Sequence, residues 1–248
     1  EEPANSKDYH QLALTLADKA LPEGWALVGS SVNARVAVAT ADSIYYKEFL
    51  PRSPVEKLKA LLKGSRAQRA RRHNDALREA GFNAPVNIAW GKLPGGREYL
   101  FSTAVEGRGI TNWVREELTA REGDSLRQRR VLLSMLGTFI GQLHAAGFIH
   151  GDLRTSNVLA AQHDDTFHFA LIDNERNVHS KPAAGRSLMR NLMQLNMLPA
   201  SDISNTDRMR FFRQWRRQMP DYSDTEAKLL AVESYRWAMR RLRKKGKA

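Results

Sequence analysis

The sequence of 248 residues contains no cysteine. This absence excludes a disulfide scaffold, a zinc site built on thiolates and thiol catalysis, and it suits a reducing compartment. The first residues also lack the basic segment and apolar stretch of a secretory signal, so nothing marks the chain for export. We therefore expect a cytoplasmic protein.

Charged residues are missing from one long segment, residues 131–151, which contains no Asp, Glu, Lys or Arg. With a Gly-x-x-x-Gly pair at Gly137 and Gly141, the segment could be read as a membrane span with a dimer face. Polar residues interrupt it, however, and its leucines and isoleucines recur at helical spacing, which is typical of a helix buried along one side. We therefore expect a core helix that is capped at Ser125 and stops at Gly147.

The remaining composition is that of a folded protein, with 42% hydrophobic, 8% aromatic and 27% charged residues. Its net charge of +12 is unevenly distributed, because residues 63–72, 208–217 and 236–248 hold 17 of the 39 basic residues and no acidic residue. The rest of the chain has 22 basic and 27 acidic residues, a net charge of −5. Such local basicity predicts an anionic partner or surface, which could be nucleic acid, anionic lipid or phosphorylated glycan.

Hydrophobic patterning divides the chain into a sheet-rich first part and a helical second part. Alternating runs separated by turn residues predict five strands around a helical stretch at 54–80 that breaks at Gly64 and Ser65. We expect an α+β fold of two lobes, an N-terminal lobe of residues 1–102 with a small antiparallel sheet and one main helix, and a mostly helical C-terminal lobe of residues 103–248. The expected strands are 25–28, 35–40, 43–49, 86–90, 98–102, 157–160 and 167–172, and the expected helices after the long one are 187–198, 207–218 and 224–242.

The clearest chemical motif is H-G-D-L-R-T-S-N, residues 150–157, directly after the long helix. Phosphoryl transfer to a hydroxyl needs a carboxylate that accepts the hydroxyl proton and an amide oxygen that holds a metal ion. Asp152 and Asn157 have the spacing for these two tasks. An apolar strand then ends at Asp173, where a carboxylate can bind Mg²⁺ that bridges nucleotide phosphates.

These motifs resemble those of the protein-kinase-like superfamily and, within it, of the bacterial lipopolysaccharide core kinases that phosphorylate Kdo or heptose sugars. The resemblance covers about residues 25–215 and is most specific at LHAAGFIHGDLRTSNVL and ALIDNE. It implies a two-lobed kinase-like fold, ATP and Mg²⁺ as cofactors, Asp152 as the catalytic base, and Asn157 and Asp173 as metal ligands. It also implies that Arg154, which stands where protein kinases have Lys, stabilises the transferring phosphoryl group.

The first half of the chain has features that match the same template. The segment GSSVNARV follows the spacing G-x-G-x-x-G-x-V, in which small residues such as Gly29 and Ser31 let the backbone approach phosphates. Strand alternation sets Lys47 between two aromatic residues on one face, where a nucleotide-binding Lys is expected. By position alone, the residues expected to lie against adenine in the hinge at 102–107 are Thr103 and Val105.

Two departures from the family pattern concern acidic residues. The helix Glu that usually pairs with the nucleotide-binding Lys is replaced by Ala70. Either Glu48 or Glu56 substitutes for it, or the site is impaired. Asn174 and Glu175 replace the Phe-Gly of D-F-G, as is common in sugar and small-molecule kinases. Glu175 either helps to bind the metal or is an exposed loop residue.

Several other residues fit more than one reading. No His pair has metal-ligand spacing, and His150 is expected to support the catalytic loop. Phe211, Phe212 and Trp215 lie among arginines, as in a nucleic-acid stacking patch, but their spacing also suits an amphipathic helix, and we favour a core position.

The expected function is therefore phosphorylation of a glycan. The chain has no A-P-E motif and only a short segment after Asp173, which argues against a peptide substrate. The basic segments favour a polyanionic, membrane-borne acceptor, so the expected partners are ATP, the lipopolysaccharide inner core or another anionic glycan, and the inner face of the inner membrane, with no nucleic acid. The alternatives are a hydroxyl kinase of the aminoglycoside or RIO-like type and a pseudokinase that binds membrane or RNA. Residues 236–247 are either a solvated chain end or a membrane contact.

Overall fold

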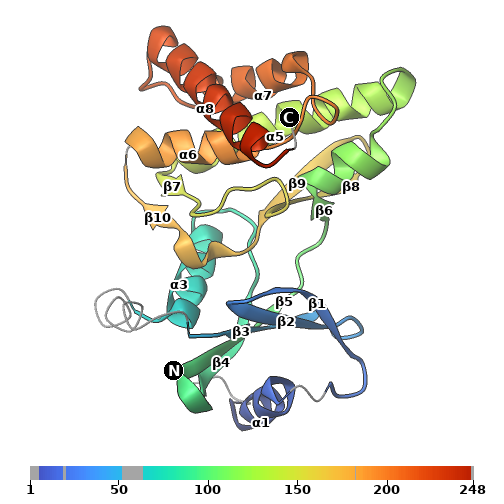
Figure 1. Cartoon of the computed structure of the whole chain (residues 1–248), viewed down its shortest axis with the longest axis vertical. Helices are drawn as coiled ribbons and strands as arrows, with labels where there is room; N and C mark the ends of the chain where they lie inside the picture. The colour runs from blue at the N-terminus through green and yellow to red at the C-terminus, as the bar shows by residue number, and fades with distance from the viewer. Residues whose placement is uncertain (1–5, 19–20, 52–63, 182, 247–248) are drawn as a thin grey trace. The chain divides into compact units, whose positions relative to one another are not determined.

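The chain divides into two compact units, residues 1–105 and 106–248 (Figure 1). The computed structural model describes residues 6–18, 21–51, 64–181 and 183–246. An antiparallel sheet in the first unit and a mostly helical second unit confirm the α+β prediction. The division lies within residues 102–107, the segment expected to be a hinge.

The first unit is built on five antiparallel strands in the order β1-β2-β3-β5-β4. Alternation along the strands gives the sheet two apolar faces. Tyr46 and Phe101 lie on the face that helix α1 covers, and Phe49 and Leu100 lie on the face that helix α3 covers (Figure 1). The elements are α1 (Ser6–Ala17), β1 (Trp25–Ser31), β2 (Ala34–Ala39), β3 (Ile44–Phe49), α3 (Arg66–Glu79), β4 (Asn87–Leu93), the single turn η1 (Pro94–Gly96) and β5 (Arg97–Thr103).

The two helices of this unit differ in how well the sequence predicted them. Helix α1 was not predicted, although its Ala13 and Leu16 are fully buried against the sheet. Helix α3 begins at Arg66, because the Ser65 side chain accepts a hydrogen bond from the backbone N–H of Gln68, so the predicted break is confirmed. Residues 52–63, which include most of the rest of the predicted helix, lie outside the described residues.

The second unit joins a long helix to two small sheets and three further helices. Strands β8 and β9 form the predicted hairpin, with β6 as a third strand, and the short strands β7 and β10 pair with each other. The elements are β6 (Arg108–Gly109), α4 (Ile110–Asn112), the wide turn η2 (Trp113–Glu117), α5 (Gly123–Ala145), β7 (Phe148–Ile149), β8 (Val158–His163), β9 (Thr166–Leu171), the single turn η3 (Asn174–Arg176), β10 (Val178–His179), α6 (Gly185–Leu195), α7 (Asn205–Arg217) and α8 (Asp224–Lys244).

The uncharged segment 131–151 lies largely in α5, and its two glycines serve packing inside the fold. A Cβ atom at Gly137 would lie 2.2 Å from the carbonyl oxygen of Phe211, and one at Gly141 would lie 2.6 Å from the Cβ of Gln218. Glycine therefore allows α5 to approach α7 closely. None of the described helices is long and apolar enough to cross a membrane.

The ends of α5 bear out one prediction and correct another. The helix stops before Gly147, which has a φ of +90°, as predicted. It begins at Gly123 with Glu122 as its N-terminal cap, so the prediction of a cap at Ser125 is wrong. Residue 125 is already inside the first turn of the helix, so it cannot be the cap. Its hydroxyl donates to the carbonyl oxygen of Ala120 at 3.3 Å.

Candidate active site

The two loops that carry the predicted catalytic and metal-binding residues adjoin each other in the second unit. Strand β7 leads into the loop 150–157, strand β10 follows the loop 173–177, and Ile149 pairs with Val178. The backbone N–H of Ile172 also donates to the carbonyl oxygen of Asn157 at 3.1 Å. The fold thus brings together four of the predicted site residues, which are Asp152, Arg154, Asn157 and Asp173.

The carboxylate of Asp152 is held by one of its two oxygens. Its Oδ1 accepts hydrogen bonds from Gln194 Nε2 at 2.8 Å and from Arg154 Nε at 2.9 Å. Gln194 is itself fixed, because its Oε1 accepts a hydrogen bond from the backbone N–H of Leu153 at 3.0 Å. Asp152 Oδ2 makes no hydrogen bond within the described part of the chain, so it can accept a proton from a hydroxyl group.

His150 supports this loop through both of its ring nitrogens. Its Nδ1 accepts a hydrogen bond from the backbone N–H of Asp152 at 3.0 Å, so the ring proton lies on Nε2. Nε2 then donates to the carbonyl oxygen of Ile172 at 3.0 Å, next to Asp173. The ring ties the catalytic loop to the end of strand β9, as predicted.

A buried chain of side chains holds the loop from behind. Trp215 Nε1 donates to His144 Nδ1 at 2.9 Å, and His144 Nε2 donates to Asn191 Oδ1 at 3.2 Å. Asn191 Oδ1 also accepts from the backbone N–H of His150 at 2.9 Å, and Asn191 Nδ2 donates to the carbonyl oxygen of His150. Burial lowers the pKa of His144 to about 4, so its ring stays neutral and keeps this pattern.

Trp215 is fully buried and stacks on Phe212, with ring centroids 5.1 Å apart. The core position that the sequence favours for this residue is therefore confirmed. The anchors Asn191 and Gln194, by contrast, were missed. A signal for them existed, because both are polar residues on the apolar face of α6, three positions apart.

The predicted metal ligands have suitable donor atoms. Asn157 Nδ2 donates to the carbonyl oxygen of Asp152 at 2.9 Å, so its Oδ1 is the atom directed away from the loop backbone. Asp173 is exposed and has a φ of +63° and a ψ of +46°, an uncommon conformation for a non-glycine residue. The described residues contain no group of three or more His, Cys, Asp or Glu side chains that could hold a metal. A magnesium site completed by nucleotide phosphates needs only one or two carboxylates, so these residues fit Mg²⁺.

Asn174 and Glu175 are both buried, which excludes the reading of Glu175 as an exposed loop residue. Asn177 Nδ2 donates to Asn174 Oδ1 at 3.1 Å, and Asn177 Oδ1 accepts from the backbone N–H of Gly151 at 3.3 Å. A Cβ atom at Gly151 would lie 2.1 Å from the Cβ of Arg176. The turn after Asp173 therefore packs directly against the catalytic loop, and only glycine fits between His150 and Asp152.

The predicted nucleotide-binding Lys47 lies on strand β3 in the first unit. Its Nζ is 5.2 Å from the centroid of the Phe49 ring, on the sheet face that helix α3 covers. The neighbouring Glu48 lies on the opposite face, fully buried, and pairs with Arg97 at 3.0 Å and Arg35 at 3.5 Å. Because successive strand residues point to opposite faces, Glu48 is not the substitute partner that the sequence left open.

The other two positions considered for the partner of Lys47 provide no carboxylate among the described residues. Ala70 is buried in one cluster with Phe49 and Leu100, so the position of the missing Glu is filled by apolar packing. Glu56 lies outside the described residues. A carboxylate that sequence reasoning missed is Glu98, which pairs in register with Phe49 and therefore lies on the same face as Lys47. Strand alternation in β5 was the signal for it.

The remaining predicted nucleotide-binding residues also lie in the first unit. Gly29 and Ser31 are on strand β1, beside the hairpin turn to β2, and an added Cβ at Gly29 would meet nothing within 4 Å. Thr103 ends β5, and its hydroxyl accepts a hydrogen bond from the backbone N–H of Val86 at 3.0 Å. Val105 is half-buried and is the last residue of the unit.

The sequence of residues 27–215 matches the model of the Lipopolysaccharide kinase (Kdo/WaaP) family, which is more than half of the chain. The chain belongs to this family. It is therefore a kinase that phosphorylates a hydroxyl group, and the aligned region contains both site loops. No curated protein matches the sequence significantly.

Solved structures agree with the kinase-like fold of this family member. The structure described as WaaP in complex with acyl carrier protein is similar with a TM-score of 0.62 at 17% identity, over 95% of this chain and 97% of that chain. Aminoglycoside phosphotransferase APH(3'')-Id from Streptomyces rimosus ATCC10970 is similar with a TM-score of 0.52 at 17% identity, over 94% of this chain and 98% of that chain. Likeness at this identity concerns the fold.

Proposed function

We propose that this lipopolysaccharide kinase transfers the γ-phosphoryl group of ATP, with Mg²⁺, to a hydroxyl group of Kdo or heptose in the lipopolysaccharide inner core. The observation that supports the proposal is the hydrogen bonding of the two oxygens of the Asp152 carboxylate. One carboxylate oxygen is fixed by Gln194 and Arg154, and the other has no partner within the described residues. This is the arrangement of an oriented general base.

The roles of the neighbouring residues follow from their atoms. Asp152 Oδ2 accepts the proton of the acceptor hydroxyl as its oxygen attacks the γ-phosphorus, and the bond from that phosphorus to the bridging oxygen breaks to release ADP. Arg154, whose side chain is 67% exposed, directs its guanidinium charge to the phosphoryl oxygens. Asn157 Oδ1 and the Asp173 carboxylate would hold Mg²⁺, which would neutralise charge on the nucleotide phosphates.

The nucleotide is proposed to contact residues of the first unit. Lys47 binds its phosphates, the backbone at Gly29 and Ser31 covers them, and Thr103 and Val105 lie against adenine. Lys47→Ala is expected to weaken ATP binding measured by calorimetry while the protein stays folded. Unchanged ATP affinity would remove Lys47 from the nucleotide site.

The proposed location is the cytoplasmic face of the inner membrane, where the exposed end of the basic segment 236–247 contacts anionic lipid. Basic residues near such a surface contribute on the order of 1 kcal/mol each. Arg240, Arg243 and Lys244 are exposed, as such a contact requires.

The experiment that tests the function uses labelled ATP, Mg²⁺ and lipopolysaccharides truncated at successive core sugars, followed by mass spectrometry of the products. Phosphate should appear on one Kdo or heptose residue and be absent when Asp152→Asn is used. Transfer to aminoglycosides instead of core sugars would assign a small-molecule kinase, and ATP binding without transfer to any acceptor would assign a pseudokinase.

A further inference from the structure

Asp152 and Arg154 line a pocket of about 760 Å³ that lies wholly within the second unit. The pocket is also lined by helix α6 through Arg190 and Gln194, and by the end of helix α8 through Arg241. Residues more than 80 positions apart in the sequence thus surround the proposed base. An acceptor whose hydroxyl meets Asp152 has to occupy this space.

The charge of the pocket lining is strongly one-sided. Asp152 is its only carboxylate among the described residues, whereas six cations line it, namely Arg115, Arg154, Arg176, Arg190, Arg241 and Lys245.

Three of these cations are already paired inside the protein. Arg115 pairs with Asp202 at 2.6 Å, Arg154 with Asp152 at 2.9 Å, and Arg176 with Glu175 at 3.5 Å. The other three, Arg190, Arg241 and Lys245, form no ion pair and no side-chain hydrogen bond with any residue that the structure describes.

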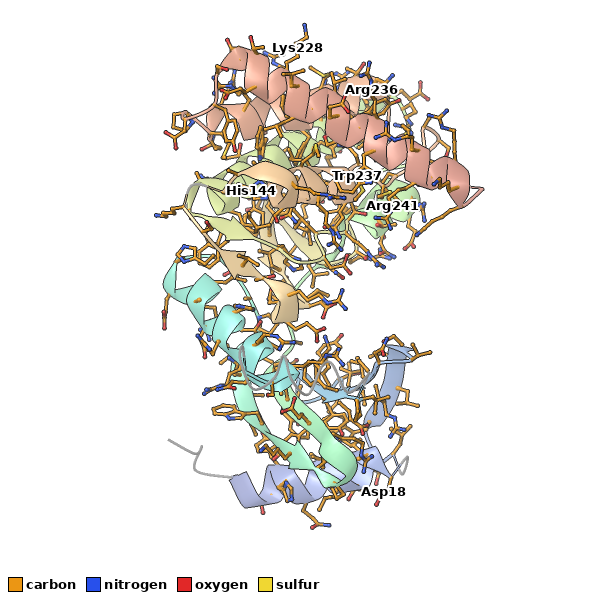
Figure 2. All side chains as sticks on the ribbon, turned by 60° about the vertical axis from the view of Figure 1, so that its left-hand side comes forward. Asp18, His144, Lys228, Arg236, Trp237 and Arg241 are labelled. Carbon is orange, nitrogen blue, oxygen red and sulfur yellow. The ribbon has the colours of Figure 1, made fainter. Side chains whose placement is uncertain are left out.

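Two of these unpaired cations lie on helices α6 and α8, which contact each other. The guanidinium carbon of Arg186 lies 5.9 Å from the centroid of the Trp237 ring, which joins the two helices. One helical turn further along each helix are Arg190 and Arg241. Figure 2 shows Trp237 and Arg241 on the side of α8 that faces the rest of the second unit, whereas Lys228 and Arg236 lie on its outer side.

Like charges that converge without counter-charges repel one another, and an anion between them removes this repulsion. Arginine side chains are suited to phosphate and carboxylate because their parallel N–H groups bind two oxygens at once. A neutral sugar would gain nothing from three unpaired cations. The lining therefore fits an acceptor that carries its own anionic group beside the reacting hydroxyl.

We propose that Arg190, Arg241 and Lys245 form an acceptor subsite that binds a phosphate or carboxylate substituent of the glycan and so positions the reacting hydroxyl at Asp152. This inference rests on the proposed function of Asp152. It gives the inner side of the C-terminal basic segment a role in substrate specificity that is separate from any contact of its outer side with lipid.

The test compares Arg190→Gln, Arg241→Gln and Lys245→Gln with Arg213→Gln as the matched control. Arg213 lies on helix α7, is exposed and does not line the pocket. The acceptor is a water-soluble, deacylated core oligosaccharide that retains its phosphate and carboxylate groups, and a second sample has the phosphates removed and the carboxylates reduced. Initial rates give kcat and KM, and calorimetry gives the affinity for the oligosaccharide without ATP.

Each pocket variant should raise the KM for the anionic oligosaccharide by about tenfold and weaken its binding to match, as loss of a charged hydrogen bond does. The KM for ATP and all constants of Arg213→Gln should stay at the wild-type values. On the neutralised oligosaccharide, wild type and pocket variants should have the same KM, which separates this role from a merely structural one.

Several outcomes overturn the subsite. A rise in the KM for ATP alone would assign these cations to the nucleotide, and equal losses in Arg213→Gln would assign a non-specific charge effect. Losses confined to membrane-embedded lipopolysaccharide would assign a lipid contact. Phosphorylation of the core sugar with pocket variants equal to wild type leaves the proposed function intact and removes the subsite. Weaker oligosaccharide binding in the variants, with no phosphate transfer by wild type, supports the subsite and removes the proposed function.

Discussion

At the scale of single residues, the site depends on which oxygen or nitrogen of each side chain is already occupied. Asp152 Oδ1 is occupied by Gln194 and Arg154, whereas Oδ2 has no partner among the described residues. His150 carries its proton on Nε2 because Nδ1 accepts from the backbone. Side-chain chemistry alone does not settle such assignments, since each group could act through either atom.

Asp152→Asn is the direct test of the base. The variant keeps the shape of the side chain but lacks a basic oxygen, so kcat should fall by about two to four orders of magnitude while ATP affinity is nearly intact. Steady-state kinetics and calorimetry measure the two quantities, and a thermal melt controls for folding. Activity within a few-fold of wild type would exclude Asp152 as the base.

The ring of His144 is predicted to remain neutral well below its ordinary titration range. Burial lowers its pKa from 6.5 to about 4, so between these pH values the unfolded chain binds a proton that the folded protein does not. The stabilising effect is therefore fully present above pH 6.5 and is lost as the pH falls towards 4, by roughly 3 kcal/mol of unfolding free energy. An NMR titration of the ring should show no midpoint above pH 5, and a midpoint near 6.5 would contradict the buried neutral ring.

At the scale of elements, α6 is the support of the catalytic loop. Its Asn191 holds the backbone of His150 and its Gln194 holds both Leu153 and the Asp152 carboxylate. These anchors work because α6 packs its apolar face on the core and brings two amide side chains under the loop. Helix α7 contributes indirectly, through the hydrogen bond from Trp215 to His144.

Gln194→Ala tests this support without touching the proposed base. Removing the amide leaves Arg154 as the one described partner of Asp152 Oδ1. We therefore expect kcat to fall by about tenfold as a charge-assisted hydrogen bond of roughly 1.4 kcal/mol is lost, with the KM for ATP unchanged. A fall in activity that only follows the thermal stability of the variant would indicate general destabilisation instead.

At the scale of the whole molecule, the three basic segments have different uses. In the first, Arg66 donates to the carbonyl oxygens of Asn33 and Leu50. In the second, Arg208 donates to those of Asn196 and Leu198. These arginines hold the fold together, so a count of basic residues overstates the charge that is free for a partner.

The outer side of α8 is where we expect lipid binding. Replacing Arg240, Arg243 and Lys244 together with Gln should weaken binding to vesicles that contain anionic lipid and reduce the salt dependence of that binding, because about 1 kcal/mol is lost per engaged cation. Vesicle sedimentation at two salt concentrations measures this. The KM for a soluble core oligosaccharide should not change, and wild-type binding to the vesicles in the triple variant would exclude a membrane contact through these residues.

The sequence by itself determined many of the elements, although not helix α1, and the residue types of the two site loops. Strand alternation in Ile44–Phe49, the helix break at Gly64 and Ser65 and the stop at Gly147 depend on neighbours only a few residues away, and each is present in the structure. The spacing from Asp152 to Asn157 is likewise local, since one short loop contains both residues.

Tertiary structure decided which distant residues contact these elements and loops. The Gln194 partner of Asp152, the packing of Ala70 against Phe49 and Leu100, and the role of Gly141 come from segments more than 20 residues away, which no local pattern encodes. The convergence of Arg190, Arg241 and Lys245 on the pocket of Asp152 is of the same kind. Packing of α6 against α8 sets it, because the side of a helix that faces the core depends on all the elements that bury it together.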